Sequence, residues 1–259
     1  MIYLFTIIIG YTLGCFQTSY IISKYIHNFD IRTKGTKNAG ASNMFTTIGW
    51  KSGLITWLFD VLKACMSIWI VTNIFNNHSD ILFLKYLAGC SAVIGHIYPF
   101  YMDFKGGKGF ASFMGLLLGI DLTTGLLCMI FAIFLTATTN YVALASIIIY
   151  ALFPFYGLYY GLFDIQVFFL TFMLGLLGIY KHKINIINML DKNELGFWEV
   201  LKGKHQSKNL YLILDFDSTI ISAETLDELA HISLIDTDKD EKIKQISSIT
   251  DKAMNGEID

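Results

Sequence analysis

Glycines and lysines alternate in residues 104–109, which read FKGGKG and lie between two long apolar runs. Three glycines within four positions let a backbone turn its N–H groups toward one point. The apolar run resumes at Phe110, so we expect this glycine turn at a helix N-terminus, where free amides favour an anion. The pattern suits a phosphate held at a membrane surface. It lacks the Walker A spacing, and a merely positive loop between two membrane helices is the alternative interpretation.

A second polar stretch, residues 30–43, reads DIRTKGTKNAGASN. Arginine is suited to bidentate phosphate contact, and the hydroxyl and amide side chains add neutral donors. Its cations and neutral donors are Arg32, Lys34, Lys37, Thr36, Asn38, Ser42 and Asn43. The stretch predicts either an anion-binding loop or a solvated polar loop.

Three further features carry polar groups in or beside apolar runs. Asp60 and Lys63 are three residues apart, so one helical face presents both as a structural ion pair or as a functional pair. His96 ends an apolar run, where a packed or capping histidine is commoner than a base. His182 and Asn185, also three apart, would share one face of a continuing helix.

The composition indicates a membrane protein. The 259 residues are 54% hydrophobic and only 15% charged, with a mean hydropathy of +0.53, whereas a soluble chain carries about 25% charged residues. The 4 cysteines have no paired spacing and are interpreted as small buried hydrophobes. No nucleic-acid partner is expected.

Apolar segments of spanning length predict an all-α polytopic membrane protein with seven transmembrane helices. These segments are 2–26, 52–75, 81–101, 109–121, 122–139, 141–162 and 163–181. Lysine and arginine gather in the alternate connections and after residue 180, which predicts an outside N-terminus and a cytoplasmic C-terminus. The first segment lacks a basic n-region and a cleavage site, so we interpret it as a retained helix.

Together these motifs resemble one family. The Asp-Ile-Arg loop, the Asp-x-x-Lys span, Gly-His-x-x-Pro followed by Phe-Lys-Gly-Gly-Lys-Gly, and the closing His-Lys-x-Asn-Ile are similar to the bacterial acyl-phosphate:glycerol-3-phosphate acyltransferases over residues 1–195. The resemblance implies a seven-span enzyme of the bacterial inner membrane. Such an enzyme moves a fatty acyl group from acyl phosphate to glycerol 3-phosphate, giving lysophosphatidic acid and phosphate, with membrane lipid around it and without a metal or cofactor.

The resemblance also implies roles for residues. The catalytic group would be Thr36, Lys108, His182 and Asn185. The substrate- and phosphate-binding group would be Arg32, Asn38, Ser42, Asn43, His96, Lys105, Gly106, Gly107 and Gly109. The chain departs from the family where Thr36-Lys37 replaces Ser-Gly and where residues 14–17, GCFQ, replace Gly-Ser-x-Pro. No serine or cysteine has an evident adjacent base, so we expect no acyl-enzyme.

After a linker at 196–208, residues 209–259 predict a second, cytosolic segment of partial α/β character. A short apolar strand precedes Asp215-Phe-Asp-Ser-Thr, which resembles the first motif of haloacid-dehalogenase-type phosphatases, most closely phosphoserine phosphatase. The resemblance implies Asp215 as phosphoryl acceptor and Asp217 as acid/base, with Thr219 and Glu224 in the same motif and Mg²⁺ alongside if the domain were complete. The later motifs are missing, so we expect this segment to be inactive.

Two other classes of function stay open at this stage. A polytopic small-molecule transporter would explain polar residues within spans, although no inverted repeat is visible and the polar segments gather at one face. A membrane-anchored phosphoserine-phosphatase-like enzyme would explain the tail. An anchor, however, needs one span and no glycine turn flanked by lysines.

Overall fold

The computed structural model describes residues 1–161 and 163–201, and the chain divides into two units, 1–207 and 208–259. The described residues form helices and connections, without a strand among them. The phosphatase-like motif, Asp215, Asp217, Thr219 and Glu224, lies outside the described residues, as does most of the expected linker.

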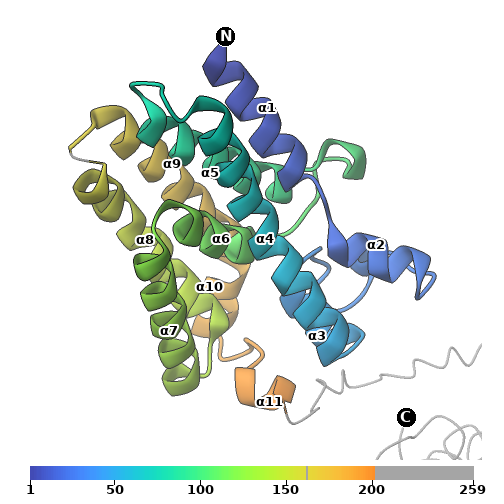
Figure 1. Cartoon of the computed structure of the whole chain (residues 1–259). Coiled ribbons are helices and arrows are strands. Elements are labelled where there is room, and N and C mark those ends of the chain that lie inside the picture. The colour runs from blue at the N-terminus through green and yellow to red at the C-terminus, as the bar shows by residue number, and fades with distance from the viewer. Residues whose placement is uncertain (162, 202–259) are drawn as a thin grey trace, which may run out of the picture. The chain divides into compact units, whose positions relative to one another are not determined.

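Eleven α-helices and two short 3-10 helices follow one another in the described part of the chain (Figure 1). They are α1 (Ile2–Gly14), α2 (Thr18–Tyr25), η1 (Ile31–Thr33), α3 (Ala41–Thr47), α4 (Trp50–Phe75), α5 (Ile81–Ile97), η2 (Phe100–Met102), α6 (Phe110–Ile120), α7 (Leu122–Thr139), α8 (Val142–Tyr160), α9 (Ile165–Lys181), α10 (Lys183–Leu190) and α11 (Phe197–Leu201). The sequence thus builds a multi-pass helical membrane protein.

Five helical segments are long and apolar enough to cross a membrane, and the bent pair α9–α10 makes a sixth. The expected span at 109–121 contains only α6, which has 11 residues. A helix of that length rises about 16 Å, roughly half of a hydrocarbon core. By length and composition, therefore, the described residues account for five or six of the seven expected spans.

Capping aspartates separate the later helices. Asp121 accepts a hydrogen bond from the Thr124 amide at 2.7 Å and so begins α7. Asp164 accepts from the Gln166 amide at 2.7 Å and so begins α9. Each carboxylate satisfies an amide that a helix leaves free at its N-terminus. Both positions are turns, as the sequence indicated.

Small residues let the helices approach closely. A Cβ built on Gly10 or Gly14 of α1 would lie 2.3 or 2.1 Å from a carbonyl oxygen of α5, and one on Gly95 of α5 would lie 2.3 Å from the Tyr11 oxygen. Likewise, a Cβ on Gly115 of α6 would lie 2.1 Å from the Val61 oxygen of α4. Lipid offers no hydrophobic drive between helices, so such packing contacts hold the bundle. They fix the ends of α5 and α6, between which the glycine turn lies.

The candidate chemistry gathers at one end of the bundle. Helices α2, α3, α10 and α11 lie toward the end opposite the N-terminus (Figure 1). There the amides of Phe197 and Trp198 donate to the backbone oxygen and side-chain oxygen of Asn140, at 2.8 and 2.9 Å. The first residues of the expected 196–208 linker are therefore helical and bound to the α7–α8 turn.

Candidate active site

The first polar loop is organised by one buried amide. Asn43 is fully buried on α3, and its Nδ2 donates to the carbonyls of Ile31, Lys34 and Asn38 at 2.9–3.1 Å. Its Oδ1 accepts from the Thr36 amide at 2.9 Å and from the Thr47 hydroxyl at 3.1 Å. Two amide hydrogens already share three acceptors, so Asn43 shapes the loop and has no donor left for a ligand.

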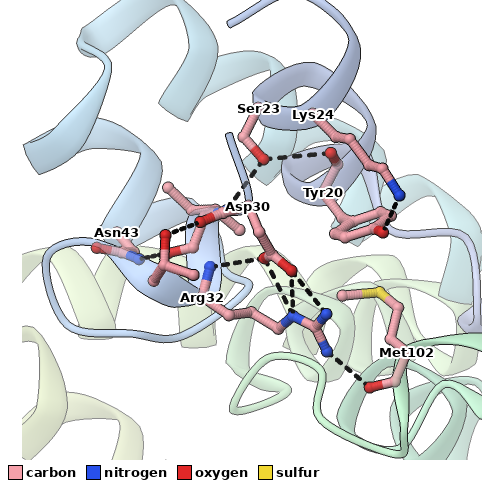
Figure 2. A network of polar contacts seen from close by, with 9 residues as sticks. Tyr20, Ser23, Lys24, Asp30, Arg32, Asn43 and Met102 are labelled. Carbon is pink, nitrogen blue, oxygen red and sulfur yellow. Dashed lines mark hydrogen bonds and ion pairs between the residues drawn. The ribbon is translucent and has the colours of Figure 1, made fainter. Parts of the chain in front are cut away.

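Arg32 joins this loop to the connection between α5 and α6. Its Nη2 lies 2.6 Å from Asp30 Oδ2, its Nε lies 3.0 Å from both Asp30 oxygens, and its Nη1 donates to the Met102 carbonyl at 2.7 Å (Figure 2). The guanidinium also lies 5.4 Å from the centre of the Tyr20 ring. One hydrogen on each terminal nitrogen is left for a ligand, because guanidinium carries five N–H groups.

Other predicted residues of the loop lie at its surface. Thr36 and Ser42 are exposed, and Asn38 is half-buried. Lys37 has φ +55°, in the left-handed region that favours glycine. That backbone angle explains why a glycine fits this position, where the chain departs from the family pattern. Within residues 1–161 and 163–201, no hydrogen bond or ion pair joins these side chains to the glycine turn.

The glycine turn packs directly on the end of α5. The Gly106 amide donates to the Ile97 carbonyl at 3.0 Å, and the Gly107 amide donates to the His96 carbonyl at 3.1 Å. A Cβ on Gly107 would lie 1.9 Å from His96 Nε2, and one on Gly106 would lie 2.0 Å from the His96 oxygen. These two amides are thus used within the protein and do not form the anion cradle expected from the sequence.

The amides that remain are those of the α6 N-terminus. Gly109, with φ +92°, is the N-cap, and α6 begins at Phe110 as the sequence predicted. The first-turn amides of a helix have no intrahelical partner and attract anions. The glycines therefore serve the site by letting the turn lie flat against α5, which puts this helix end beside Lys108.

Lys108 reaches a residue 77 positions away. Its Nζ donates to Asn185 Oδ1 at 2.6 Å, and Asn185 Nδ2 in turn donates to Glu194 Oε1. The glycine turn and the closing His-Lys-x-Asn motif are therefore in direct contact. Lys105, by contrast, is exposed.

His182 and Asn185 lie at and just after a bend between two helices. The helix bends by 48° between α9 and α10, and His182 lies at the break, where its Nδ1 is 2.8 Å from the Gly178 carbonyl. Its ring is buried beside Tyr150, with ring centres 6.1 Å apart. The charges of Lys108 and Lys181 both act on this ring, so His182 borders the same cluster.

Lys181 and Glu194 belong to this cluster, although sequence reasoning did not select them. Lys181 Nζ lies 4.9 Å from the centre of the Tyr98 ring. Burial lowers the pKa of Lys108, and the charge of Lys181 lowers it further, whereas the carboxylate of Glu194 raises it. Lys181 immediately precedes the His-Lys-x-Asn motif and Glu194 lies 9 residues after its asparagine, and that proximity in sequence was the available signal. A site with two lysines and one carboxylate favours an added anion.

A buried trio of ionisable side chains lies behind the turn. Lys63 Nζ is 2.8 Å from Asp60 Oδ1 and 2.8 Å from His96 Nδ1, and it donates to the Phe16 carbonyl at 2.8 Å. His96 Nδ1 lies 3.3 Å from Asp60 Oδ1. All three side chains are at most 5% exposed. His96 therefore joins the Asp-x-x-Lys pair to the glycine turn.

Metal chemistry finds no ligand set in the described part of the chain. Among residues 1–161 and 163–201, no group of three histidine, cysteine, aspartate or glutamate side chains could hold a metal ion.

Comparisons with known proteins show the family of the chain. The family model for glycerol-3-phosphate acyltransferase matches residues 4–192. The chain is 36% identical over 202 residues to the glycerol-3-phosphate acyltransferase of Clostridioides difficile (strain 630), covering 74% of this chain and 94% of that protein. It is 32% identical over 189 residues to that of Prochlorococcus marinus (strain MIT 9312), covering 73% and 94%.

Two solved structures are similar as well. Both are crystal structures of PlsY, an integral membrane glycerol 3-phosphate acyltransferase. The glycerol 3-phosphate form has a TM-score of 0.68 and 31% identity, covering 77% of this chain and 98% of that one. The lysophosphatidic acid form has a TM-score of 0.66 and 30% identity, with the same coverage. The chain therefore belongs to the glycerol-3-phosphate acyltransferase family.

Proposed function

We propose that this chain transfers a fatty acyl group from acyl phosphate to glycerol 3-phosphate, releasing lysophosphatidic acid and phosphate. The observation that carries the proposal is the contact between Lys108 and Asn185, at 2.6 Å. It joins two motifs that are 77 residues apart, and Lys108 directly precedes the N-cap of α6. The named activity of the family members and the substrate and product forms of PlsY support the same reaction.

Phosphate would bind at the N-terminus of α6. Lys108 is half-buried, and its ammonium is disfavoured there by burial and by Lys181. A phosphate dianion beside it would offset both costs, because charge-assisted hydrogen bonds are about twice as strong as neutral ones. The helix-end amides would add donors that need no reorganisation. Lys105, Gly106, Gly107, Gly109 and His96 would shape this end of the site.

The second phosphate would be bound by the first loop. Arg32 keeps two N–H groups beyond those used by Asp30 and Met102, and the hydroxyls of Thr36 and Ser42 are exposed. Asn38 would add a side-chain donor, and Asn43 would hold the loop in shape. Two cationic subsites would offset the repulsion between the phosphates and orient the glycerol hydroxyl toward the acyl carbon.

Acyl transfer would be direct. The glycerol hydroxyl oxygen forms a bond to the acyl carbon, the bond from that carbon to the phosphate oxygen breaks, and the hydroxyl proton goes to the departing phosphate. Lys108 and the α6 amides would stabilise the charge that develops on the acyl oxygen and on the leaving phosphate, with Thr36, His182 and Asn185 positioning the reactants. Each atom of the reaction is accounted for without a covalent enzyme intermediate.

The decisive measurement is phosphate release from acyl phosphate by membranes that contain the full chain, with and without glycerol 3-phosphate. We expect release that requires glycerol 3-phosphate, yields lysophosphatidic acid and is lost in Lys108→Ala. Lys85→Ala, at a lysine of α5 outside this cluster, is the matched control. Release without glycerol 3-phosphate, or none in folded protein, would contradict the proposal.

We also propose the finer topology, with seven crossings, an outside N-terminus and a cytoplasmic C-terminus. The lysine distribution supports it, and α6 would cross as a short span. Single cysteines at Lys105 and Asn76, in a background without native cysteines, would test it. An impermeant thiol reagent added to intact cells should label position 76 and not position 105. The reverse pattern would overturn the orientation.

For residues 209–259 we propose kinship with the front of haloacid-dehalogenase-type phosphatases, on the Asp215-Phe-Asp-Ser-Thr pattern. Comparing phosphoserine hydrolysis by the full chain and by Asp215→Asn tests for activity. We expect no difference between them. Hydrolysis lost in the variant would show an active domain.

A further inference from the structure

We propose that Asp60 and Lys63 are positioning residues that act on the glycine turn through His96, by fixing the hydrogen of its ring on Nε2. The inference rests on the proposed function, because it assigns the turn a role in that reaction. It deepens that function by adding two buried residues of α4 that reach the glycine turn only through His96.

Burying Asp60 and Lys63 inside a membrane-spanning helix costs free energy. Asp60 and Lys63 are 1% and 5% exposed, within the span α4. Charges at such depth are expensive unless paired, and in membrane helices they mark functional groups. The ion pair of 2.8 Å offsets part of that cost. Apolar side chains could replace a pair that is required only for stability. The other contacts of Asp60 and Lys63 therefore bear on why charged residues lie here.

Lys63 makes two contacts besides its ion pair with Asp60. An ammonium has hydrogens only to give. Lys63 Nζ donates to the Phe16 carbonyl at 2.8 Å and lies 2.8 Å from His96 Nδ1, to which the ammonium can only donate. A ring nitrogen that accepts carries no hydrogen, so the hydrogen of the neutral imidazole lies on Nε2. The longer distance of 3.3 Å from Nδ1 to Asp60 agrees with this assignment.

The ring of His96 faces the glycine turn. Its Nε2 edge faces the turn, since a Cβ on Gly107 would lie 1.9 Å from that atom. Its carbonyl accepts from the Gly107 amide at 3.1 Å and from Gln17 Nε2 at 2.7 Å. Side chain and backbone of one residue therefore both contact Gly107. Fixing the ring from α4 fixes the turn that precedes Lys108.

Gln17 shows how this chain reinforces the same residue. It stands at the break between α1 and α2, where the family pattern has proline, and it is fully buried. Proline has no side-chain donor, so the bond from Gln17 Nε2 to the His96 carbonyl depends on this substitution. The departure at residues 14–17 thus adds a contact on His96 from a third element of the bundle.

The direct test is the position of the ring hydrogen. Nitrogen NMR of the full chain with ¹⁵N-labelled histidine, in lipid nanodiscs, reports the protonation of each ring nitrogen, and His96→Gln assigns the signal. We expect hydrogen on Nε2 only in the wild type, and a mixture of both neutral forms in Lys63→Met. Hydrogen on Nδ1 in the wild type would overturn the inference without any variant.

The kinetic test asks whether Lys63 acts through His96. A misplaced reacting group can cost ~100-fold in rate, so we expect Lys63→Met and Asp60→Asn to lower kcat/KM by ~10–100-fold, with kcat falling more than KM rises. Lys85→Met, the same change elsewhere on the neighbouring helix, should leave kcat/KM unchanged. The double variant Lys63→Met/His96→Gln should be no slower than His96→Gln alone.

The outcomes separate the two proposals. Independent losses that multiply in the double variant would overturn the inference, as would wild-type kinetics in Asp60→Asn. If Lys63→Met does not fold, the wild-type ring measurement and Asp60→Asn still decide. If wild-type membranes transfer no acyl group, the proposed function fails, while the ring measurement still tests the positioning of His96.

Discussion

The first loop and the glycine turn, the two candidate anion-binding segments of this protein, are both rich in glycine and basic residues but are held in shape in different ways. The first loop is built around a side chain, since the single amide of Asn43 bonds four backbone groups and the Thr47 hydroxyl. The glycine turn is built on the absence of side chains, because Gly106 and Gly107 lie against the backbone and ring of His96. Truncating the Asn43 side chain should therefore destabilise the loop, whereas adding a side chain to a glycine of the turn should destabilise the turn.

The largest effect should come from the turn's charge. Replacing Lys108 by alanine removes the only side-chain contact found between the glycine turn and Asn185 in the described part of the chain. Loss of one such donor at a developing charge costs about 100-fold or more in kcat. Lys105→Ala should cost less, since Lys105 is exposed. Acyl transfer measured for both variants checks this order, and equal losses would contradict it.

The next effect comes from adding one methyl group to the turn. Gly107→Ala would place a Cβ 1.9 Å from His96 Nε2, and such overpacking costs about 1–3 kcal/mol or more. We expect loss of activity with a lower unfolding temperature. Gly40→Ala in the first loop is the control, because its nearest contact would be 3.1 Å away, at Asn38 Nδ2. The comparison fails if the two alanines behave alike.

The third largest effect should come from removing the side-chain amide of Asn43 from the first loop. Asn43→Ala leaves buried carbonyls and the Thr36 amide without their partner, and each buried unsatisfied group costs about 1–3 kcal/mol. We expect a drop in the free energy of unfolding of about 2–4 kcal/mol and a raised KM for glycerol 3-phosphate. Ser42→Ala, at an exposed neighbour on the same helix, should leave unfolding unchanged. Chemical denaturation of both variants in the same detergent distinguishes them.

A smaller gain should come from Lys37→Gly. The φ of +55° at Lys37 is strained for a residue with a Cβ, and that conformation costs roughly 1 kcal/mol relative to glycine. We expect the variant to unfold at a slightly higher temperature with activity equal to or above the wild type. A lower unfolding temperature would show that the lysine side chain compensates for its backbone.

The smallest effect concerns pH. Arg32 holds the pKa of Asp30 below its usual value through its side-chain hydrogen bonds. A lowered carboxyl pKa adds stability that is present above the unfolded pKa of Asp30 and is lost as pH falls through the folded pKa. The pair is partly exposed, so the contribution is about 0.5 kcal/mol. Unfolding of wild type and Asp30→Asn at pH 7 and pH 3 should converge at the lower pH, and a constant difference would contradict the prediction.

Several features of this protein could be predicted from short stretches of its sequence. Apolar run length predicted a polytopic helical protein, and capping aspartates marked the turns at Asp121 and Asp164. The motifs identified the family, and they included Lys108 and Asn185, which the structure brings into contact. The α6 N-terminus was also predictable, since glycine followed by an apolar run is a local signal.

Packing decided what each motif residue does. The sequence predicted that Asn43 and the amides of Gly106 and Gly107 bind phosphate. In the structure these three groups donate instead to backbone carbonyls of the protein. The helix bends at His182, and close contact between α4 and α5 joined Lys63 to His96. Contacts between residues 33 or 77 positions apart depend on how helices cross, and no short pattern encodes that.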